Sequence, residues 1–236
     1  MNRLLVSLLL PAAIALSVPA AFAQPGPTPP RIVVVGEGEA AVAPDLALLT
    51  LGVMREAATA GEALDAANKA MAAVIADMKA AGVADRDLQT AGLQVMPRYT
   101  FTNRPDGSQE AQLVGYQVTN TLSVRVREIA KAGELLDRAV KLGVNQNTSI
   151  AFANDDTSAV LTEARQRAVA DAMARARTLS EAAGVSLGRV LEIVEQNGAT
   201  PLPLMEKAFA RAADAVPVEA GENAYRVQVT VTFELR

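Results

Sequence analysis

Histidine, cysteine and tryptophan are all absent from the 236-residue sequence. Without histidine or cysteine, the chain lacks the groups needed for Ser-His-Asp triads, cysteine nucleophiles, zinc sites and haem ligation. Only serine–lysine, carboxylate or tyrosine chemistry remains. The sequence therefore predicts no catalytic residue, no metal ligand and no cofactor site. A carboxylate-based or divalent-cation-dependent hydrolase stays open as the alternative.

Two pairs of neighbouring acidic residues are the first candidates for a metal site. They are Asp85 with Asp87 and Asp155 with Asp156. Calcium and magnesium bind clusters of oxygen ligands, but neither pair has the spacing of an EF-hand loop. Both pairs flank predicted helices or strands, where aspartate is favoured as a cap. Capping is therefore the preferred interpretation. Among 26 acidic residues, no pair is singled out for glycoside hydrolysis.

Gly36 and Gly38 follow a predicted strand and could suggest a phosphate-binding loop. The motif lacks a third glycine and a following helix, and Glu37 and Glu39 would repel a phosphate group. Glycines in an edge strand more often permit a bulge or the close approach of another backbone. We therefore expect a structural role, with both glutamates facing water.

The remaining polar candidates are weaker. Asn145 to Thr148 is predicted to be a polar turn, and the sequon at Asn147 need not be glycosylated. Arg165 and Arg175 could reach an acidic partner, although long side chains that flank an apolar stripe more often extend along the edge of the core.

The element that organises the chain is a predicted helix from Asp155 to Val185. Its small and apolar residues recur at three- and four-residue steps and form one stripe, namely Leu161, Ala164, Ala168, Ala172, Ala176, Leu179 and Ala183. Because the stripe is mostly alanine, it can lie close against a sheet. Glu163 with Arg167 and Asp171 with Arg175 form i,i+4 pairs on the solvated side. Candidate N-caps are Asp155, Asp156, Thr157 and Ser158, and Gly184 ends the helix.

Two further helices are predicted. Thr59 with Glu62 has the spacing of a capping box, and Met71 and Met78 lie on the apolar face of the helix that follows. A middle helix from Ile129 to Leu142 ends, like the other two, at a glycine.

The strands alternate with these helices. Runs of β-forming residues predict strands at Ile32–Val35, Leu46–Met54, Gln94–Phe101, Leu113–Val126, Ser149–Ala153, Arg189–Glu195 and Tyr225–Leu235. We expect the first two to pair as a hairpin across Pro44-Asp45, and the next two to form a long hairpin around Asn103–Gly107. Gly198–Asn223 is a long irregular segment with room for a short helix at 204–213.

These elements predict an α+β fold in which a largely antiparallel sheet is covered on one face by three helices. The fold can divide into two lobes, with residues 88–154 inserted between the N-terminal and C-terminal portions that pack together. The folded domain is expected to span residues 31–236.

The N-terminus has the pattern of a signal peptide. Arg3 precedes an apolar run, and Ala21-Phe22-Ala23 fits the cleavage site, so the mature chain is expected to begin at Gln24 with a flexible lead-in over residues 24–30. No other segment approaches the roughly 20 apolar residues of a membrane span. The predicted location is the periplasm. A net charge of −4 disfavours nucleic acid as a partner.

Several short motifs, in order, resemble the SIMPL-domain family over the whole mature chain. They are Ile32–Glu39 followed by Pro44-Asp45, Gly115-Tyr116, Ala182–Val190, and Val216–Glu222 before a valine-rich strand. The resemblance implies an exported α+β protein like those called periplasmic immunogenic or oxidative-stress-defence proteins. It brings no established reaction and no catalytic residues.

The leading hypothesis is a non-enzymatic envelope protein that acts by self-assembly or by binding another envelope protein, with a homo-oligomer expected. Strong strand edges and the long proline-containing segment motivate it. A role in stress defence follows only from the resemblance. Scavenging of oxidants by methionine is a poor explanation, because Met71 and Met78 are expected in the core.

Overall fold

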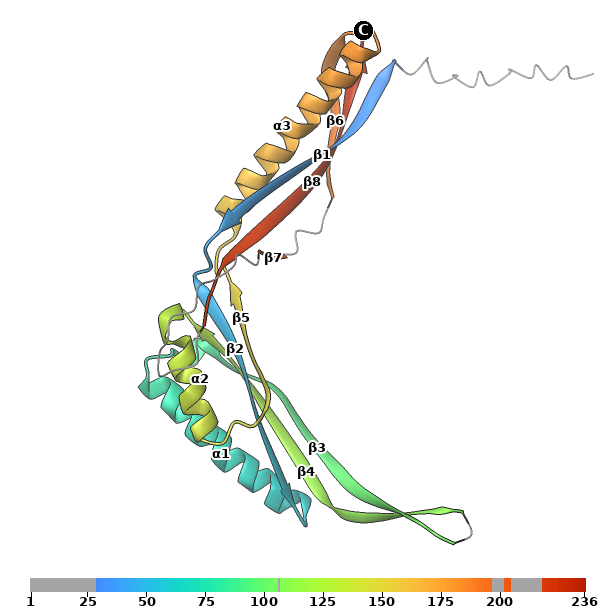
Figure 1. The fold of residues 1–236 in the computed structure, drawn as a ribbon. Coiled ribbons are helices and arrows are strands. Elements are labelled where there is room, and N and C mark those ends of the chain that lie inside the picture. The colour runs from blue at the N-terminus through green and yellow to red at the C-terminus, as the bar shows by residue number, and fades with distance from the viewer. Residues whose placement is uncertain (1–28, 106, 197–201, 205–217) are drawn as a thin grey trace, which may run out of the picture.

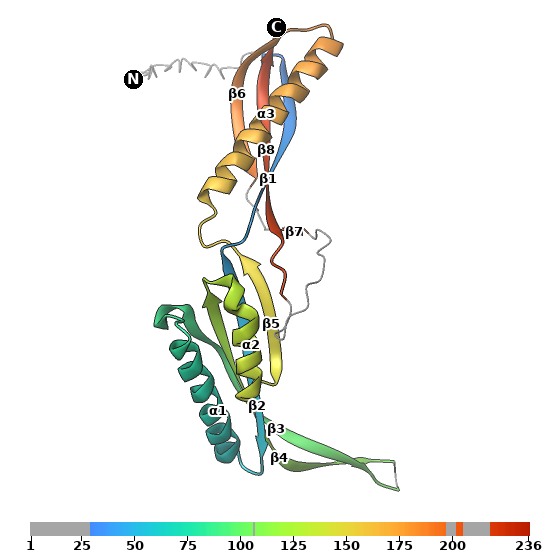
Figure 2. The same ribbon diagram turned by 60° about the vertical axis from the view of Figure 1, so that its left-hand side comes forward.

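The computed structural model describes residues 29–105, 107–196, 202–204 and 218–236. The predicted signal peptide and nearly all of the lead-in lie outside these residues, as does the short helix expected at 204–213 apart from Leu204. Figures 1 and 2 show an elongated molecule with two separate sheets placed end to end.

The first sheet is built from the two ends of the chain and is called the terminal sheet here. Its order is β1-β8-β6, and the short strand β7 also pairs with β8. The bounds are β1 Arg31–Val42, β6 Leu187–Gln196, β7 Leu202–Leu204 and β8 Glu222–Leu235. All of these pairings are antiparallel. Helix α3, Ser158–Ala182, lies along one face.

The second sheet, called the central sheet, comes from the middle of the chain in the order β3-β4-β2-β5. Its strands are β2 Leu46–Ala57, β3 Leu88–Asn103, β4 Gln109–Val126 and β5 Gln146–Ala153. Helices α1, Ala60–Ala80, and α2, Ala132–Lys141, share one hydrophobic core with it. Short 3₁₀ turns, η1 at Asp85–Asp87 and η2 at Ile129–Lys131, precede β3 and α2.

The α+β class and the antiparallel pairing expected from the sequence are confirmed. The strands are distributed over two sheets, with α3 on one and α1 and α2 on the other. The division into lobes with an insertion at 88–154 stays a prediction. The central sheet itself begins earlier than that insertion, at Leu46.

The predicted hairpin between the first two strands is wrong. β1 pairs along its whole length with β8, while β2 pairs with β4 and β5 in the other sheet. Pro44 and Asp45 lie between the end of β1 and the start of β2, which belong to different sheets. Figure 1 shows the chain passing from one sheet to the other between these two strands. The reason is that β1 and β8 bury their apolar residues together under α3, and a Pro-Asp pair lacks the glycine that favours a tight hairpin turn.

The alanine stripe of α3 packs directly on β1. Ala164, Ala168, Ala172 and Ala176 are all completely buried. A Cβ on Gly36 would lie 2.2 Å from the carbonyl oxygen of Ala168, so only glycine allows this approach. Two residues expected on the stripe lie outside it: Leu179 is 52% exposed, and Ala183 is exposed as well. The buried face of α3 instead continues from Ala176 to Ser180, where it ends.

Most local helix signals are confirmed, although the side chain of Thr157, the N-cap of α3, makes no capping hydrogen bond. Thr59 and Glu62 form the capping box at the start of α1. Met71 and Met78 are buried in the core of the central sheet. At the end of α3, the N–H of Val185 donates to the carbonyl of Ser180 and that of Gly184 to Glu181, which is a Schellman motif.

Asn154 ties the two sheets together where the chain passes between them. Its Nδ2 donates to the carbonyl of Ala43 at 2.8 Å, and its Oδ1 accepts from Asn223 Nδ2 at 2.9 Å and from the Tyr225 hydroxyl at 3.0 Å. Three separate chain segments therefore meet at one side chain.

Candidate functional site

The acidic pairs singled out in the sequence are engaged in ion pairs and hydrogen bonds in the structure. Asp85 pairs with Lys79 at 2.9 Å, whereas Asp87 turns inward and is 5% exposed. Asp156, one residue before the N-cap Thr157 of α3, accepts from the backbone N–H of Ser158 at 2.8 Å. Within the described residues, no three Asp or Glu side chains are grouped so that they could hold a metal ion.

Asp87 and Asp155, from different pairs, are instead joined by arginines of β4 and the segment after it. Arg127 binds Asp87 with both Nε and Nη2, at 3.2 and 3.1 Å, and donates to Asp155 at 2.6 Å. Arg125 also donates to Asp155. The interactions link the start of β3 to the segment between β5 and α3.

The arginines set the protonation of this cluster. The hydrogen bond from Arg127 lowers the pKa of Asp155 below its ordinary value, and the charges of Arg127, Arg125 and Arg86 act in the same direction. The two carboxylates in turn raise the pKa of Arg127. Asp155 is therefore a stable anion at neutral pH, which suits a structural ion pair better than a proton-transfer group.

The Gly36-x-Gly38 motif has the structural role expected for it. Helix α3 lies against it and uses its polar side chains to occupy the free edge of β1. The N–H of Glu37 donates to Asp171 at 2.9 Å, and the carbonyls of Val35 and Glu39 accept from Arg175 and Arg167. Because the Glu37 N–H is already bonded to a carboxylate, this edge does not form a phosphate cradle.

The other polar candidates also have internal partners. Arg165 binds Glu195 of β6 at 3.0 Å. The i,i+4 ion pairs of α3 are present, with Arg167 on Glu163 and Arg175 on Asp171. Asn145 bridges to the backbone of Met54, accepting from its N–H at 2.8 Å.

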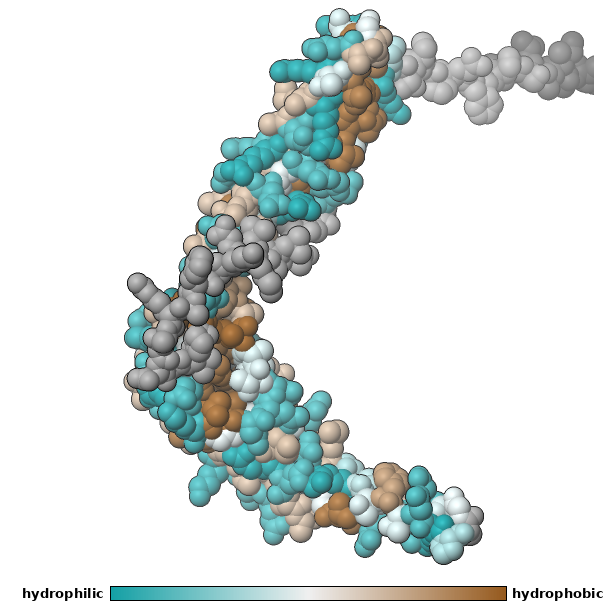
Figure 3. Space-filling model, viewed as in Figure 1, coloured by the Kyte–Doolittle hydropathy of each residue, from teal (hydrophilic) through white to brown (hydrophobic). Residues whose placement is uncertain are grey.

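The most distinctive surface is the far end of the β3–β4 hairpin. The sequence predicted the hairpin but not its exposure. Figure 1 shows that the two strands continue well beyond α1 as a projecting ribbon, which we call the arm and define as residues 97–103 and 109–115. Apart from Leu88, every residue of β3 is exposed. In Figure 3 hydrophobic residues reach the surface along the arm.

The register divides the arm into an apolar face and a polar face. Tyr99 lies opposite Leu113, and Phe101 lies opposite Ala111, so these four side chains share one face. Thr100 opposite Gln112 and Thr102 opposite Glu110 occupy the other. Tyr99, Phe101 and Leu113 are 52%, 65% and 46% exposed. Leu93 and Val95, nearer the helices, are also about half exposed, at 51% and 47%.

The apolar face continues the side of the sheet that α1 covers farther along. Side chains alternate along a strand, so Val95 and Tyr99 point to the same side of β3. Val95 is opposite Val118, which is buried against α1 residues. Large exposed apolar surfaces are typical of interaction sites, and an isolated two-stranded ribbon is only marginally stable in water. The arrangement suits association with another polypeptide.

One sequence signal could have revealed the exposed arm. Tyr99 and Phe101 alternate with Thr100 and Thr102, near the far end of a strand that is longer than α1 and α2 could cover. An alternating pattern shows that one face is apolar but does not show what covers that face.

Comparisons with known proteins agree on the family. The family described as "SIMPL: Protein of unknown function (DUF541)" matches residues 32–233. The 26 kDa periplasmic immunogenic protein of Brucella melitensis is 48% identical over 231 residues, covering 94% of this chain and 92% of the relative. The uncharacterized protein YggE of Escherichia coli K12 is 30% identical over 235 residues, covering 96% and 92%.

These relatives are named as periplasmic, immunogenic or uncharacterized proteins, and none of these names states a reaction. In the part of the chain that the structure describes, no helix combines the length and hydropathy of a membrane crossing. The resemblance suggested by the sequence motifs is confirmed by the match over residues 32–233, and the chain belongs to the SIMPL family.

Proposed function

We propose that this chain is a non-enzymatic protein of the bacterial cell envelope, exported to the periplasm through residues 1–23, that works by self-association through the apolar face of the arm. The exposed row formed by Tyr99, Phe101 and Leu113 is the observation that carries the proposal. A role in stress defence stays a prediction from the family resemblance.

The chemistry of the arm favours a second copy of the chain as the partner. Tyr99, Phe101, Ala111 and Leu113 carry no charge, so two copies can place the same face together without like-charge repulsion. A twofold contact uses one self-complementary patch on both subunits. Stacked sheets pack through just such rows of apolar side chains, about 10 Å apart.

Strand β1 differs from the arm because side chains of another element cover its free edge. The outer edge of β1 has its backbone groups at Val35, Glu37 and Glu39 bonded to side chains of α3. Such cover prevents an edge from pairing with another chain. The apolar face of the arm, by contrast, stays about half exposed at Tyr99, Phe101 and Leu113, which supports its assignment as the contact surface.

Light scattering coupled to size-exclusion chromatography on residues 24–236 tests the proposal. The unmodified chain is expected to elute as a defined oligomer. The double variant Tyr99→Thr/Phe101→Thr keeps good strand-forming residues but removes the aromatic surface, so it is expected to give a smaller species. The matched control is Thr100→Ser/Thr102→Ser on the polar face of the same strand, which should elute like the unmodified chain.

A monomeric unmodified chain would contradict self-association. Affinity capture from envelope extract, compared between the unmodified chain and the double variant, would then ask whether the arm binds a different protein. If the oligomer persists unchanged in the double variant, the contact lies elsewhere on the molecule. Circular dichroism of all three proteins shows whether folding is preserved.

The hydrolase alternative has no arrangement in its favour among the described residues. Its metal-dependent form predicts a thermal shift with calcium, magnesium or manganese. A ligand at 100 times its dissociation constant stabilises a protein by about 2.7 kcal/mol. No shift with any of the three ions would remove that form of the alternative.

A further inference from the structure

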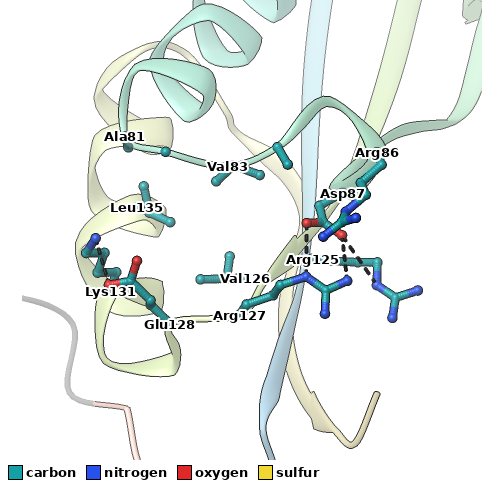
Figure 4. A pocket seen from close by; sticks show the side chains of 12 residues that line it. Ala81, Val83, Arg86, Asp87, Arg125, Val126, Arg127, Glu128, Lys131 and Leu135 are labelled. Carbon is teal, nitrogen blue, oxygen red and sulfur yellow. Dashed lines mark hydrogen bonds and ion pairs between the residues drawn. The ribbon is translucent and has the colours of Figure 1, made fainter. Parts of the chain in front are cut away.

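A pocket of about 210 Å³ lies at the end of the hairpin opposite to the arm. Its walls come from the loop after α1, from η1, from the end of β4 and from the start of α2. Figure 4 shows two chemically different sides. Arg86, Arg125 and Arg127 gather around Asp87 on one side, whereas Val83, Val126 and Leu135 form the other.

The polar side of the pocket has more donors than acceptors. Arg125 and Arg127 share the carboxylates of Asp87 and Asp155, and Arg86 brings a third guanidinium group to the pocket. Each guanidinium group has five N–H donors. Nε of Arg125 is buried, has no hydrogen-bond acceptor among the described residues, and stands 4.0 Å from Asp87. Arg86 is exposed and makes no hydrogen bond or ion pair with any described residue.

The charge at the pocket opposes that of the whole chain. Arg86, Arg125, Arg127 and Lys131 line it together with only two acidic residues, Asp87 and Glu128, although the chain carries a net charge of −4. Glu128 is already paired with Lys131 at 2.7 Å. Asp155, which does not line the pocket, pairs with both Arg125 and Arg127. Counting it, one positive charge remains in excess, and it is that of Arg86. An anion that reaches this point gains charge-assisted hydrogen bonds.

The apolar side of the pocket favours an anion that also has an apolar portion. Val126 and Leu135 are only 3% and 2% exposed, so the floor of the pocket belongs to the core of the central sheet. Val83 completes this wall and is partly exposed. A liquid water occupies about 30 Å³, so the pocket has room for roughly seven waters or a ligand the size of benzoate. Bare phosphate would leave the apolar wall uncovered.

We propose that this pocket binds a small organic acid, with its carboxylate on Arg86 and Arg125 and its apolar body against Val83, Val126 and Leu135. The ligand class is a monocarboxylate with a short aliphatic or aromatic body. This site is independent of association through the arm, because the two surfaces occupy opposite ends of β3 and β4.

Benzoate is the probe for this site, with amide chemical shifts of residues 24–236 as the readout. Saturable shifts are expected in the loop at residues 82–87 and in residues 125–131. Benzamide has the same shape without the charge, and inorganic phosphate has the charge without the apolar body. Both should bind at least about tenfold more weakly, because each lacks one of the two interactions.

The variant Arg86→Gln removes a side chain that has no hydrogen bond or ion pair with a described residue, so the fold should stay intact. It is expected to weaken benzoate binding about tenfold or more, the value of a charge-assisted hydrogen bond. Arg177→Gln, exposed on α3, is the matched control and should bind as the unmodified chain does.

Three results would overturn the proposal. They are no saturable benzoate shift at the pocket, equal binding of benzamide, or unchanged affinity in Arg86→Gln. The variant Val83→Ser tests the apolar wall separately. It should weaken benzoate binding while leaving the weak phosphate binding as it is, and equal benzoate binding by this variant also counts against the site.

Discussion

A Cβ atom placed on Gly38 would lie 2.0 Å from the carbonyl oxygen of Ala164. That distance is far shorter than a van der Waals contact, and the atom that the Cβ would meet belongs to the backbone of the helix. Helix α3 and strand β1 are therefore in contact through backbone atoms. The terminal sheet depends on the smallest residues on both sides of this contact.

The first prediction concerns this contact. Gly38→Ala is expected to destabilise the protein by about 1–3 kcal/mol or more, because overpacking forces the helix away from the sheet. Urea denaturation monitored by circular dichroism measures the loss. Gly61→Ala is the control, since a Cβ there meets nothing within 4 Å, and it should be neutral or slightly stabilising. Equal stability of the two variants would contradict the close approach.

The second prediction concerns the connection between the sheets. Asn154→Ala leaves the Tyr225 hydroxyl without its acceptor, and Asn223 keeps only a 3.4 Å bond to the carbonyl of Phe152. Both residues are buried, being 4% and 5% exposed, so the expected loss is about 1–3 kcal/mol. Asn103→Ala, on the exposed arm, should change stability by less than about 0.5 kcal/mol. Unfolding midpoints of the two variants give the comparison.

The third prediction is a pH dependence. The pKa of Asp155 is lowered by Arg127 in the folded state, so its contribution to stability is present above its unfolded pKa of about 3.9 and is lost as pH falls through the lower folded value. The pKa values of Asp156 and Asp171 are lowered too and act in the same direction. The melting temperature should therefore be nearly constant above about pH 5 and should fall below about pH 4.

The variant Asp155→Asn isolates one part of this effect. It should be less stable than the unmodified chain at pH 7, and the difference should shrink as the pH falls. Asp65→Asn, an exposed substitution on α1, serves as the control and should keep the unmodified pH profile. A difference that grows on acidification would reverse the sign of the argument.

The fourth prediction separates the methionines by burial. Met96 and Met173 are 49% and 37% exposed, whereas Met71 and Met78 are 3% and 0% exposed. Brief peroxide treatment of the folded protein should oxidise the first pair well before the second, as peptide mass spectrometry can measure. If Met71 and Met78 do not oxidise before unfolding, scavenging by these residues is excluded. Rapid oxidation of Met78 without unfolding would show that the core opens readily.

The sequence alone was sufficient for features that depend on neighbouring residues. The capping box at Thr59, the alanine stripe of α3 and the glycine that ends that helix follow local rules of backbone hydrogen bonding and periodicity. The long β3–β4 hairpin was also predictable, because its turn residues lie between two alternating segments. The absence of histidine and cysteine restricts the possible chemistry through composition alone.

Only the tertiary structure decided which distant segments meet. The pairing of β1 with β8 depends on α3 burying both strands together, and the network of Asp87, Arg127 and Asp155 joins residues from three parts of the chain. The exposure of Tyr99 and Phe101 depends on how much of the hairpin the helices cover. Alternation in a sequence identifies the apolar face of a strand. Whether that face is buried depends on which other parts of the chain pack against it, and the local sequence does not contain those parts.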